Sequence, residues 1–167
     1  MAITISVPAT KADFDGFGYV LWKSWHETYT GLIDPDYLAG ITLERAQAAA
    51  NRTNTNPELG QLIAKDGERV VGIVGFGPCR DSDLPGAGEV YAIYVLAEYH
   101  NQKIGYALMQ AAFERLDSYD TIAVWALREN TRALRFYERF GFRYEGTDRE
   151  LVLGKPVPER RMVYRRG

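Results

Sequence analysis

Apolar residues recur along the chain with two different periods, and the change from one period to the other predicts where helices and strands lie. A spacing of three to four residues indicates amphipathic helices, and these cover 11–29, 43–51, 104–117 and 128–140. Runs of β-branched and aromatic residues indicate strands, and these cover 3–7, 61–65, 69–78, 89–97, 121–127, 143–154 and 158–166. The Gly, Asp and Pro content of 31–40 and 80–88 is typical of loops.

The order of these segments predicts an α/β (α+β) fold. Asp66-Gly67 separates two β-rich runs, which favours a hairpin in the first half of the chain. The strands at 89–97 and 121–127 are apolar on both faces, which predicts that both faces are covered, and each strand is followed by a helix. We therefore expect a three-layer sandwich, with a mixed and mostly antiparallel central sheet between helices, in a single domain over 1–167.

Composition and charge narrow the classes of function. The formal net charge of −2 gives the chain no general attraction to nucleic acid or anionic lipid. The single cysteine, Cys79, excludes an intrachain disulfide, and with only His26 and His100 it excludes the common structural zinc sites. The first residues do not resemble a signal peptide, and no apolar run is long enough to cross a bilayer. We expect a soluble cytoplasmic protein with no nucleic-acid or membrane partner and no metal.

The turn that follows the strand at 89–97 is a candidate anion site. A helix begins near Ile104 and Gly105, and the free N–H groups of a helix N-terminus attract anions. Gly105 allows a ligand to approach the backbone, and Lys103 adds a positive charge. An ordinary strand-to-helix loop with a solvated lysine explains the same residues.

The helix at 128–140 contains a second group of residues that can carry chemistry. Asn130 lies at its start, and Tyr137 lies on its apolar face. A tyrosine in such a position either fills the core or presents its hydroxyl to a ligand.

Together these two segments resemble the coenzyme A motifs of the GNAT superfamily of acyl-CoA-dependent N-acetyltransferases. The strand and pyrophosphate-loop motif is matched by Ile93, Tyr94 and Val95, followed by 100–105. His100 replaces the usual Gln or Arg of that loop, and Lys103 replaces its first Gly. The second motif is matched at Asn130, Ala133, Phe136, Tyr137, Gly141 and Phe142.

The resemblance implies that an acetyl group passes directly from acetyl-CoA to a primary amine, without a covalent enzyme intermediate. The residues that it implies for binding coenzyme A are Ile93, Tyr94, Val95, His100, Asn101, Gln102, Lys103, Ile104, Gly105, Tyr106, Asn130, Ala133, Phe136 and Tyr137. Tyr137 matches the general acid of the family. Glu89 matches its base, although a solvated glutamate at the start of a strand is an equal interpretation. Arg132 or Arg135 can meet the 3′-phosphate or simply face solvent.

Period-two alternation places Glu89 on one strand face with Tyr91, Ile93 and Val95. The acceptor pocket is expected to use Trp25, Tyr29 and Tyr37, while His26 is expected to be a structural residue. Five acidic residues fall in regions that can border the pocket: Asp34, Asp36, Asp81, Asp83 and Glu89. Such an acidic rim favours a small cationic amine such as a polyamine, although ordinary polar loops explain the same residues.

Two other functions stay open at this point. One is acetylation of a protein amine, and the other is a non-catalytic protein that binds or senses acyl-CoA. A nucleotide-hydrolysing enzyme is disfavoured, because Gly154-Lys155 is followed by proline and has no strand, loop and helix around it. The resemblance also implies that a homodimer can form.

Overall fold

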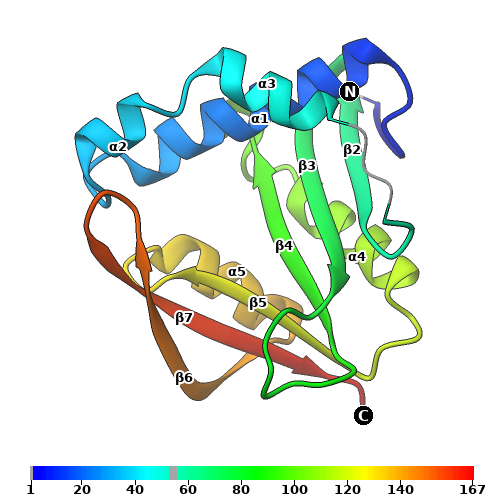
Figure 1. Cartoon of the computed structure of the whole chain (residues 1–167). Helices are drawn as coiled ribbons and strands as arrows, with labels where there is room; N and C mark the ends of the chain where they lie inside the picture. Colours follow the sequence, from blue (N-terminus) through cyan, green and yellow to red (C-terminus); the bar gives the residue numbers. More distant parts are fainter. Residues whose placement is uncertain (1, 53–55) are drawn as a thin grey trace.

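The computed structural model describes residues 2–52 and 56–167, and these residues are arranged around one twisted sheet (Figure 1). The sheet has the strand order β1-β2-β3-β4-β5-β7-β6. β4 and β5 are its parallel pair, and the other neighbours are antiparallel. The strands are β1 (Ile3–Ser6), β2 (Gly60–Asp66), β3 (Arg69–Pro78), β4 (Gly88–Val95), β5 (Thr121–Leu127), β6 (Arg143–Val152) and β7 (Pro156–Arg165).

Helices cover both faces of this sheet, which confirms the predicted three-layer fold (Figure 1). On one face lie α1 (Lys11–Tyr29), α2 (Pro35–Ala39) and α3 (Leu43–Asn51). On the other face lie α4 (Ile104–Arg115) and α5 (Thr131–Phe140), and the short helix η1 (Ala97–Tyr99) precedes α4. No described helix is both long and apolar enough to cross a membrane.

The predicted loop at 31–40 and the predicted start of the last helix were wrong, and local capping explains both; several other predicted ends differ by one or two residues. The predicted loop at 31–40 contains α2, because the Asp34 carboxylate accepts a hydrogen bond from the Tyr37 N–H at 3.1 Å and Pro35 suits the first helical turn. The last helix begins at Thr131 rather than at 128, because the Asn130 side chain caps it by accepting from the Ala133 N–H at 3.3 Å.

β4 contains a bulge at Tyr91. Its register with β3 pairs Val90 with Phe76 and then Ala92 with Gly75, so that Tyr91 has no partner on β3. One extra residue shifts the alternation of side chains beyond it by one position.

The bulge corrects the predicted face of Glu89. Directly opposed residues of an antiparallel pair project to the same face, and the partners of Glu89, Ala92 and Tyr94 on β3 are successive odd-numbered residues. Glu89 therefore shares the α1 face with Ala92 and Tyr94. Ile93 and Val95 project to the α4 face instead.

The sheet divides between its two parallel strands. β4 and β5 pair only over Gly88–Val90 and Ile122–Val124, and the strands diverge beyond these residues (Figure 1). The last residues of β4, from Tyr91 to Val95, are half-buried rather than covered on both faces, which corrects the predicted burial. Main-chain groups of β4 on the β5 side are thereby left without a neighbouring strand.

A small second core joins the two halves of the sheet on the α1 face. It contains Tyr29 and Ile33 from α1 and the turn after it, Leu127 from β5 and Val157 from β7. The turn between β6 and β7 packs on α2 so closely that a Cβ added at Gly154 would lie 2.7 Å from the Asp34 Cβ, and Gly154 also has a positive φ of 78°. This contact closes the α1 side of the divided sheet.

Candidate active site

A cavity of about 760 Å³ occupies the division between β4 and β5. Its lining comes from both faces of the sheet: Tyr29 of α1 on one side, and Gly105 of α4 and Tyr137 of α5 on the other. The cavity therefore connects the α4 and α5 face with the α1 face through the sheet itself.

The residues predicted to bind coenzyme A gather around this cavity, although they are far apart in the sequence. The lining includes Ile93, Tyr94, Val95, His100, Asn101, Lys103, Ile104, Gly105, Tyr106, Asn130, Ala133, Phe136 and Tyr137. Gln102 is the predicted residue that is not part of the lining.

The start of α4 has the geometry of an anion site. Lys103 occupies the N-cap position in the left-handed conformation, with φ 62° and ψ 19°, and its side chain makes no capping hydrogen bond. Asn101 is also left-handed, with φ 64°. The first N–H groups of α4 have no helical acceptor, so they are available to an anionic ligand beside the Lys103 charge.

His100 connects this loop to β4. Its Nε2 lies 2.8 Å from the Val95 carbonyl oxygen. A carbonyl oxygen can only accept a hydrogen bond, so Nε2 carries a hydrogen and donates it. The contact holds the loop against the end of the strand and uses one acceptor site of the Val95 carbonyl oxygen.

Four basic side chains belong to the cavity lining. They are His100, Lys103, Arg132 and Arg139, and no described Asp or Glu contributes to the lining. All four come from the loop before α4 and from α5, so the positive charge lies at the end where α4 begins. Arg135 is not part of the lining, whereas Arg139, which the sequence analysis did not single out, is.

Tyr137 lies deep in the cavity and is 6% exposed. Burial is the main cause that raises the pKa of its phenol far above the usual value, and the neighbouring Tyr29 adds to the effect. The hydroxyl therefore stays protonated throughout the neutral range and can act as a proton donor, not as a base.

Two further phenols lie on the α1 side of the cavity. The Tyr29 hydroxyl is 2.9 Å from the Tyr94 hydroxyl, so one donates to the other. Burial raises the pKa of both groups, and Tyr94 is also affected by Tyr29 and Tyr137. Tyr29 was predicted as an acceptor-pocket residue, and its side chain lines the cavity.

The other two predicted acceptor residues do not line the cavity. Trp25 packs edge-on against Tyr29 with ring centroids 4.7 Å apart, so it supports the wall from behind. Tyr37 is 40% exposed and lies against the turn between β6 and β7.

Trp125 lines the cavity and was not predicted. Its Nε1–H donates to the Asp81 carboxylate at 2.9 Å, and the Arg149 guanidinium lies 3.8 Å from its ring centroid. The sequence offers no local signal for this role, because Trp125 occupies an ordinary apolar strand and faces the cavity only where β5 leaves β4.

Glu89 lies outside the cavity lining and is 1% exposed. Its carboxylate accepts from the Arg80 side chain at 2.7 Å and from the Arg80 N–H at 3.1 Å. Tyr91, which does line the cavity, is adjacent: Arg80 lies over its ring at 4.5 Å, and burial together with the Glu89 charge raises the pKa of Tyr91 to about 12.

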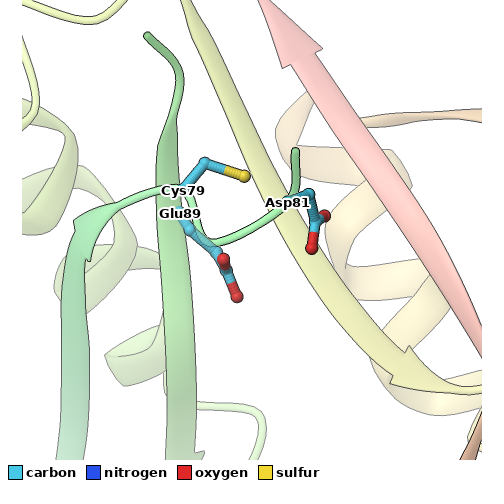
Figure 2. A group of neighbouring side chains, drawn as sticks. All are labelled: Cys79, Asp81 and Glu89. Carbon is cyan, nitrogen blue, oxygen red and sulfur yellow. The ribbon is translucent and has the colours of Figure 1, made fainter. Parts of the chain in front are cut away.

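Cys79, Asp81 and Glu89 lie together where the chain leaves β3 and enters the loop before β4, with ligand atoms within 4.8 Å of one another (Figure 2). Both carboxylates are already bound by arginines, since Arg161 is 3.1 Å from Asp81 and Arg80 is 2.7 Å from Glu89. Burial raises the pKa of the Cys79 thiol to about 11, which opposes both metal ligation and nucleophilic attack.

Most of the acidic side chains that were expected to form a rim around the pocket make structural contacts instead. Asp83 is bound by the Arg161 guanidinium at 2.7 Å, and Asp34 caps α2. With Asp81 and Glu89 also paired, four of the five residues have local partners, and none of the five lines the cavity. His26 is likewise structural, because its Nε2 lies 2.9 Å from the Ile41 carbonyl oxygen.

The fold and the cavity define a class of protein in which an uncapped helix start, suited to an anionic group, opens onto a division in the sheet. The sequence profile of the Acetyltransferase (GNAT) family matches residues 20–142. The chain therefore belongs to the GNAT family and is an acyl-CoA-dependent N-acetyltransferase.

Individual relatives agree with this assignment. The chain is 30% identical to the uncharacterized N-acetyltransferase YuaI of Bacillus subtilis, over 79% of this chain and 76% of the relative. It is 27% identical to the probable N-acetyltransferase Rv2775 of Mycobacterium tuberculosis, over 83% and 79%. The solved PaiA N-acetyltransferase of Thermoplasma acidophilum, crystallised with coenzyme A, has the same fold, with a TM-score of 0.76, 22% identity and 99% coverage of both chains.

Proposed function

We propose that this enzyme transfers the acetyl group of acetyl-CoA to the primary amine of a small molecule, inside the cavity between β4 and β5. The observation that carries the proposal is the composition of the cavity. It combines an uncapped helix start and basic side chains at one end with a buried phenol in the middle. This arrangement suits a ligand with phosphates at one end and a reactive group at the other.

The chain's own residues divide the binding of coenzyme A between them. The first amides of α4 and Lys103 hold the pyrophosphate, because both provide positive potential at the same point. Arg132 and Arg139 serve the 3′-phosphate from α5. The unpaired edge of β4 binds the pantetheine arm as a strand binds a peptide, and Asn130, Ala133 and Phe136 border it.

Tyr137 is the proposed general acid. In the transfer, the amine nitrogen forms a bond to the acetyl carbon, the carbon–sulfur bond breaks, and the sulfur requires a proton. The Tyr137 hydroxyl is buried, protonated and part of the cavity wall, so it can supply that proton. Cys79 is not part of the lining, and its thiol has a raised pKa, which agrees with direct transfer.

Glu89 remains the proposed base, and its position outside the cavity lining requires that it accept the proton indirectly. The carboxylate is held by Arg80 and is separated from the cavity by Tyr91, so a proton from the amine must reach it through ordered water. Replacing Glu89 by Gln keeps the shape and removes the charge. We expect that change to lower kcat at neutral pH and to leave acetyl-CoA affinity unchanged.

The expected polyamine preference rested on an acidic rim. Because four of those five side chains are held by arginines or a helix cap and none of the five lines the cavity, we propose a small amine and take polyamines as one class to be measured against others. We propose the cytoplasm as the place of action, because a chain with a single cysteine does not use the intrachain disulfides typical of small secreted proteins.

The deciding experiment measures thiol release from acetyl-CoA with amines of several classes, for the wild type and Tyr137→Phe. We expect Tyr137→Phe to lower kcat about 100-fold, because a general acid contributes on that order, with little change in acetyl-CoA affinity. Tyr144→Phe, on the exposed part of β6, is the matched control and should behave as wild type. A Tyr137→Phe enzyme of full activity would contradict the assignment.

Binding without turnover would favour the second candidate, an acyl-CoA sensor. The replacement of the usual loop residues by His100 and Lys103 is the feature that supports this alternative. Protection of the protein by acetyl-CoA against unfolding, with no thiol release for any small amine or lysine peptide, would identify it.

A further inference from the structure

The lining on the α1 side of the cavity is mainly aromatic and includes no described Asp, Glu, Lys or Arg, which bears on the identity of the acceptor. Its wall contains Tyr29, Tyr94, Tyr91 and Trp125, and Tyr137 borders it from α5. The register of the sheet places Tyr94 and Trp125 on the same face as α1. We call these five side chains the aromatic chamber.

The basic side chains of the lining belong to the other end of the cavity. His100, Lys103, Arg132 and Arg139 lie around the start of α4 and along α5, where coenzyme A phosphates are proposed to bind. No described Asp or Glu is part of the cavity lining. The Glu159 carboxylate acts on Tyr29 and Tyr94 from behind, but Arg149 binds it at 2.9 Å, so a polycationic acceptor would find no unpaired counter-charge there. A polycation would also lose the hydration of every additional ammonium group.

The Tyr29 and Tyr94 hydroxyl groups of the chamber keep unused hydrogen-bond acceptor sites. Each phenol offers one donor and two acceptor sites, and the contact at 2.9 Å between Tyr29 and Tyr94 uses one donor and one acceptor. That leaves three acceptor sites and one donor on the pair. Since a single ammonium or amine group donates hydrogen bonds and is attracted to aromatic rings, it matches this pair without a carboxylate.

Trp125 provides a rigid apolar wall. Its indole N–H is bound by Asp81, and Arg149 is stacked on its ring, so the side chain is held before any ligand arrives. Asp81 is in turn held by Arg161, which is 4% exposed. A preorganised indole loses little freedom on binding, and it favours a flat apolar partner.

We propose that the acceptor is a monoamine with an aromatic or apolar body, of the arylalkylamine type, whose amine is held by Tyr29 and Tyr94 and whose body packs on Trp125. The inference rests on the proposed function of the cavity. Burial among neutral rings also lowers the pKa of the bound ammonium, which favours the nucleophilic free amine.

The test compares kcat/KM for phenethylamine and tryptamine with that for putrescine, spermidine and a lysine peptide. We expect the arylalkylamines to be at least about tenfold better, a ratio that apolar contact with one aromatic wall can supply. We also expect that ratio to change less than about twofold between low and high salt, because no ion pair selects the acceptor.

Variants connect the preference to the chamber. Trp125→Leu should raise KM for tryptamine about tenfold and leave KM for putrescine unchanged. Trp22→Leu is the matched control, because Trp22 packs on Tyr19 and His26 and is not part of the cavity lining. Tyr94→Phe should raise KM for both kinds of amine, because it removes the phenol pair. Acetyl-CoA affinity, measured by calorimetry, should stay at the wild-type value in both tryptophan variants, and circular dichroism shows that each of the three variants has folded.

The outcomes separate the two proposals. A preference for polyamines or for the peptide, or equal use of all amines, overturns the chamber assignment and leaves the proposed acetyltransferase function intact. Acetyl-CoA binding with no turnover of any amine overturns the proposed small-molecule function, and the chamber assignment falls with it.

Discussion

Single residues at the start of α4 accept an unfavourable backbone conformation. Asn101 and Lys103 are left-handed, where an L-residue without special stabilisation costs roughly 1 kcal/mol. The same loop turns the first amides of α4 toward the cavity. Strain at a binding loop of this kind is compatible with a function that depends on the loop's shape.

Lys103→Gly separates shape from charge. Glycine adopts φ 62° freely, so we expect this variant to raise the free energy of unfolding by about 1 kcal/mol. Loss of the ammonium should weaken coenzyme A binding about fivefold, which corresponds to a contact of about 1 kcal/mol. Thermal unfolding and calorimetry measure the two effects.

Lys103→Ala is the control, because alanine keeps the strain and removes the charge. It should bind coenzyme A as weakly as the glycine variant but should not gain stability. Equal stability of both variants would show that the left-handed conformation carries no cost at this position.

At the scale of elements, α1 is anchored at its start by a buried carboxylate. Asp13 completes a capping box with Thr10 and binds Lys65 of β2 at 2.9 Å, which connects the helix to the sheet. The Ala9 N–H, together with Lys65, lowers the pKa of Asp13 to about 2. The carboxylate therefore has to remain charged for α1 to keep its position.

The sign of the pH effect follows from the direction of this shift. Because the pKa of Asp13 is lower in the folded state than in the unfolded state, its contribution to the free energy of unfolding is complete above about pH 4. That contribution is lost as the pH falls toward 2. Asp13→Asn should cost roughly 1.5–3 kcal/mol at neutral pH, as expected for hydrogen bonds to a charged group, and should flatten the acid limb of the stability curve.

Asp15→Asn provides the comparison on the same helix. Asp15 pairs with the exposed Lys11 and accepts a hydrogen bond from Asn51, and solvent screening leaves such a surface ion pair with little effect on stability. Chemical unfolding from about pH 2 to 7 distinguishes the variants. If both lost the same stability, the connection of Asp13 to Lys65 would not be important.

At the scale of the whole molecule, the ligand site crosses the weakest join in the sheet. β4 and β5 share only three residue pairs, whereas β5 and β7 share seven. A ligand that touches β4, α4 and α5 at once joins the two halves of the fold. Binding of such a ligand would therefore also hold the two halves of the sheet together.

Coenzyme A should stabilise the folded protein accordingly. At a concentration 100 times Kd, we expect a gain of about 2.7 kcal/mol in the free energy of unfolding. Hydrogen exchange should slow at the β4 amides from Tyr91 to Val95, with β1 and β2 as an unaffected control region. Protection limited to the loop before α4 would show that the ligand does not join the two halves.

Much of the fold and of the cavity lining could be predicted from the sequence, because the patterns that indicate them extend over only a few neighbouring residues. The element order follows from the periodicity of apolar residues, and the start of α4 follows from a strand, a polar turn and Gly105. Motif spacing was enough to identify most residues of the cavity lining, since the positions around Asn130 and Tyr137 lie on one helix.

The rest depends on contacts between distant segments, which no local pattern encodes. Tertiary structure decided that a bulge at Tyr91 turns Glu89 away from Ile93, and that Trp125 borders the cavity. It also decided that arginines from β7 and from the loop after β3 neutralise the expected acidic rim. By itself the sequence determined the layers, the family resemblance and the basic end of the cavity, because helix and strand periods and motif spacings act over a few residues. The character of the acceptor end depends on how two diverging strands and α1 meet, and only folding brings these together.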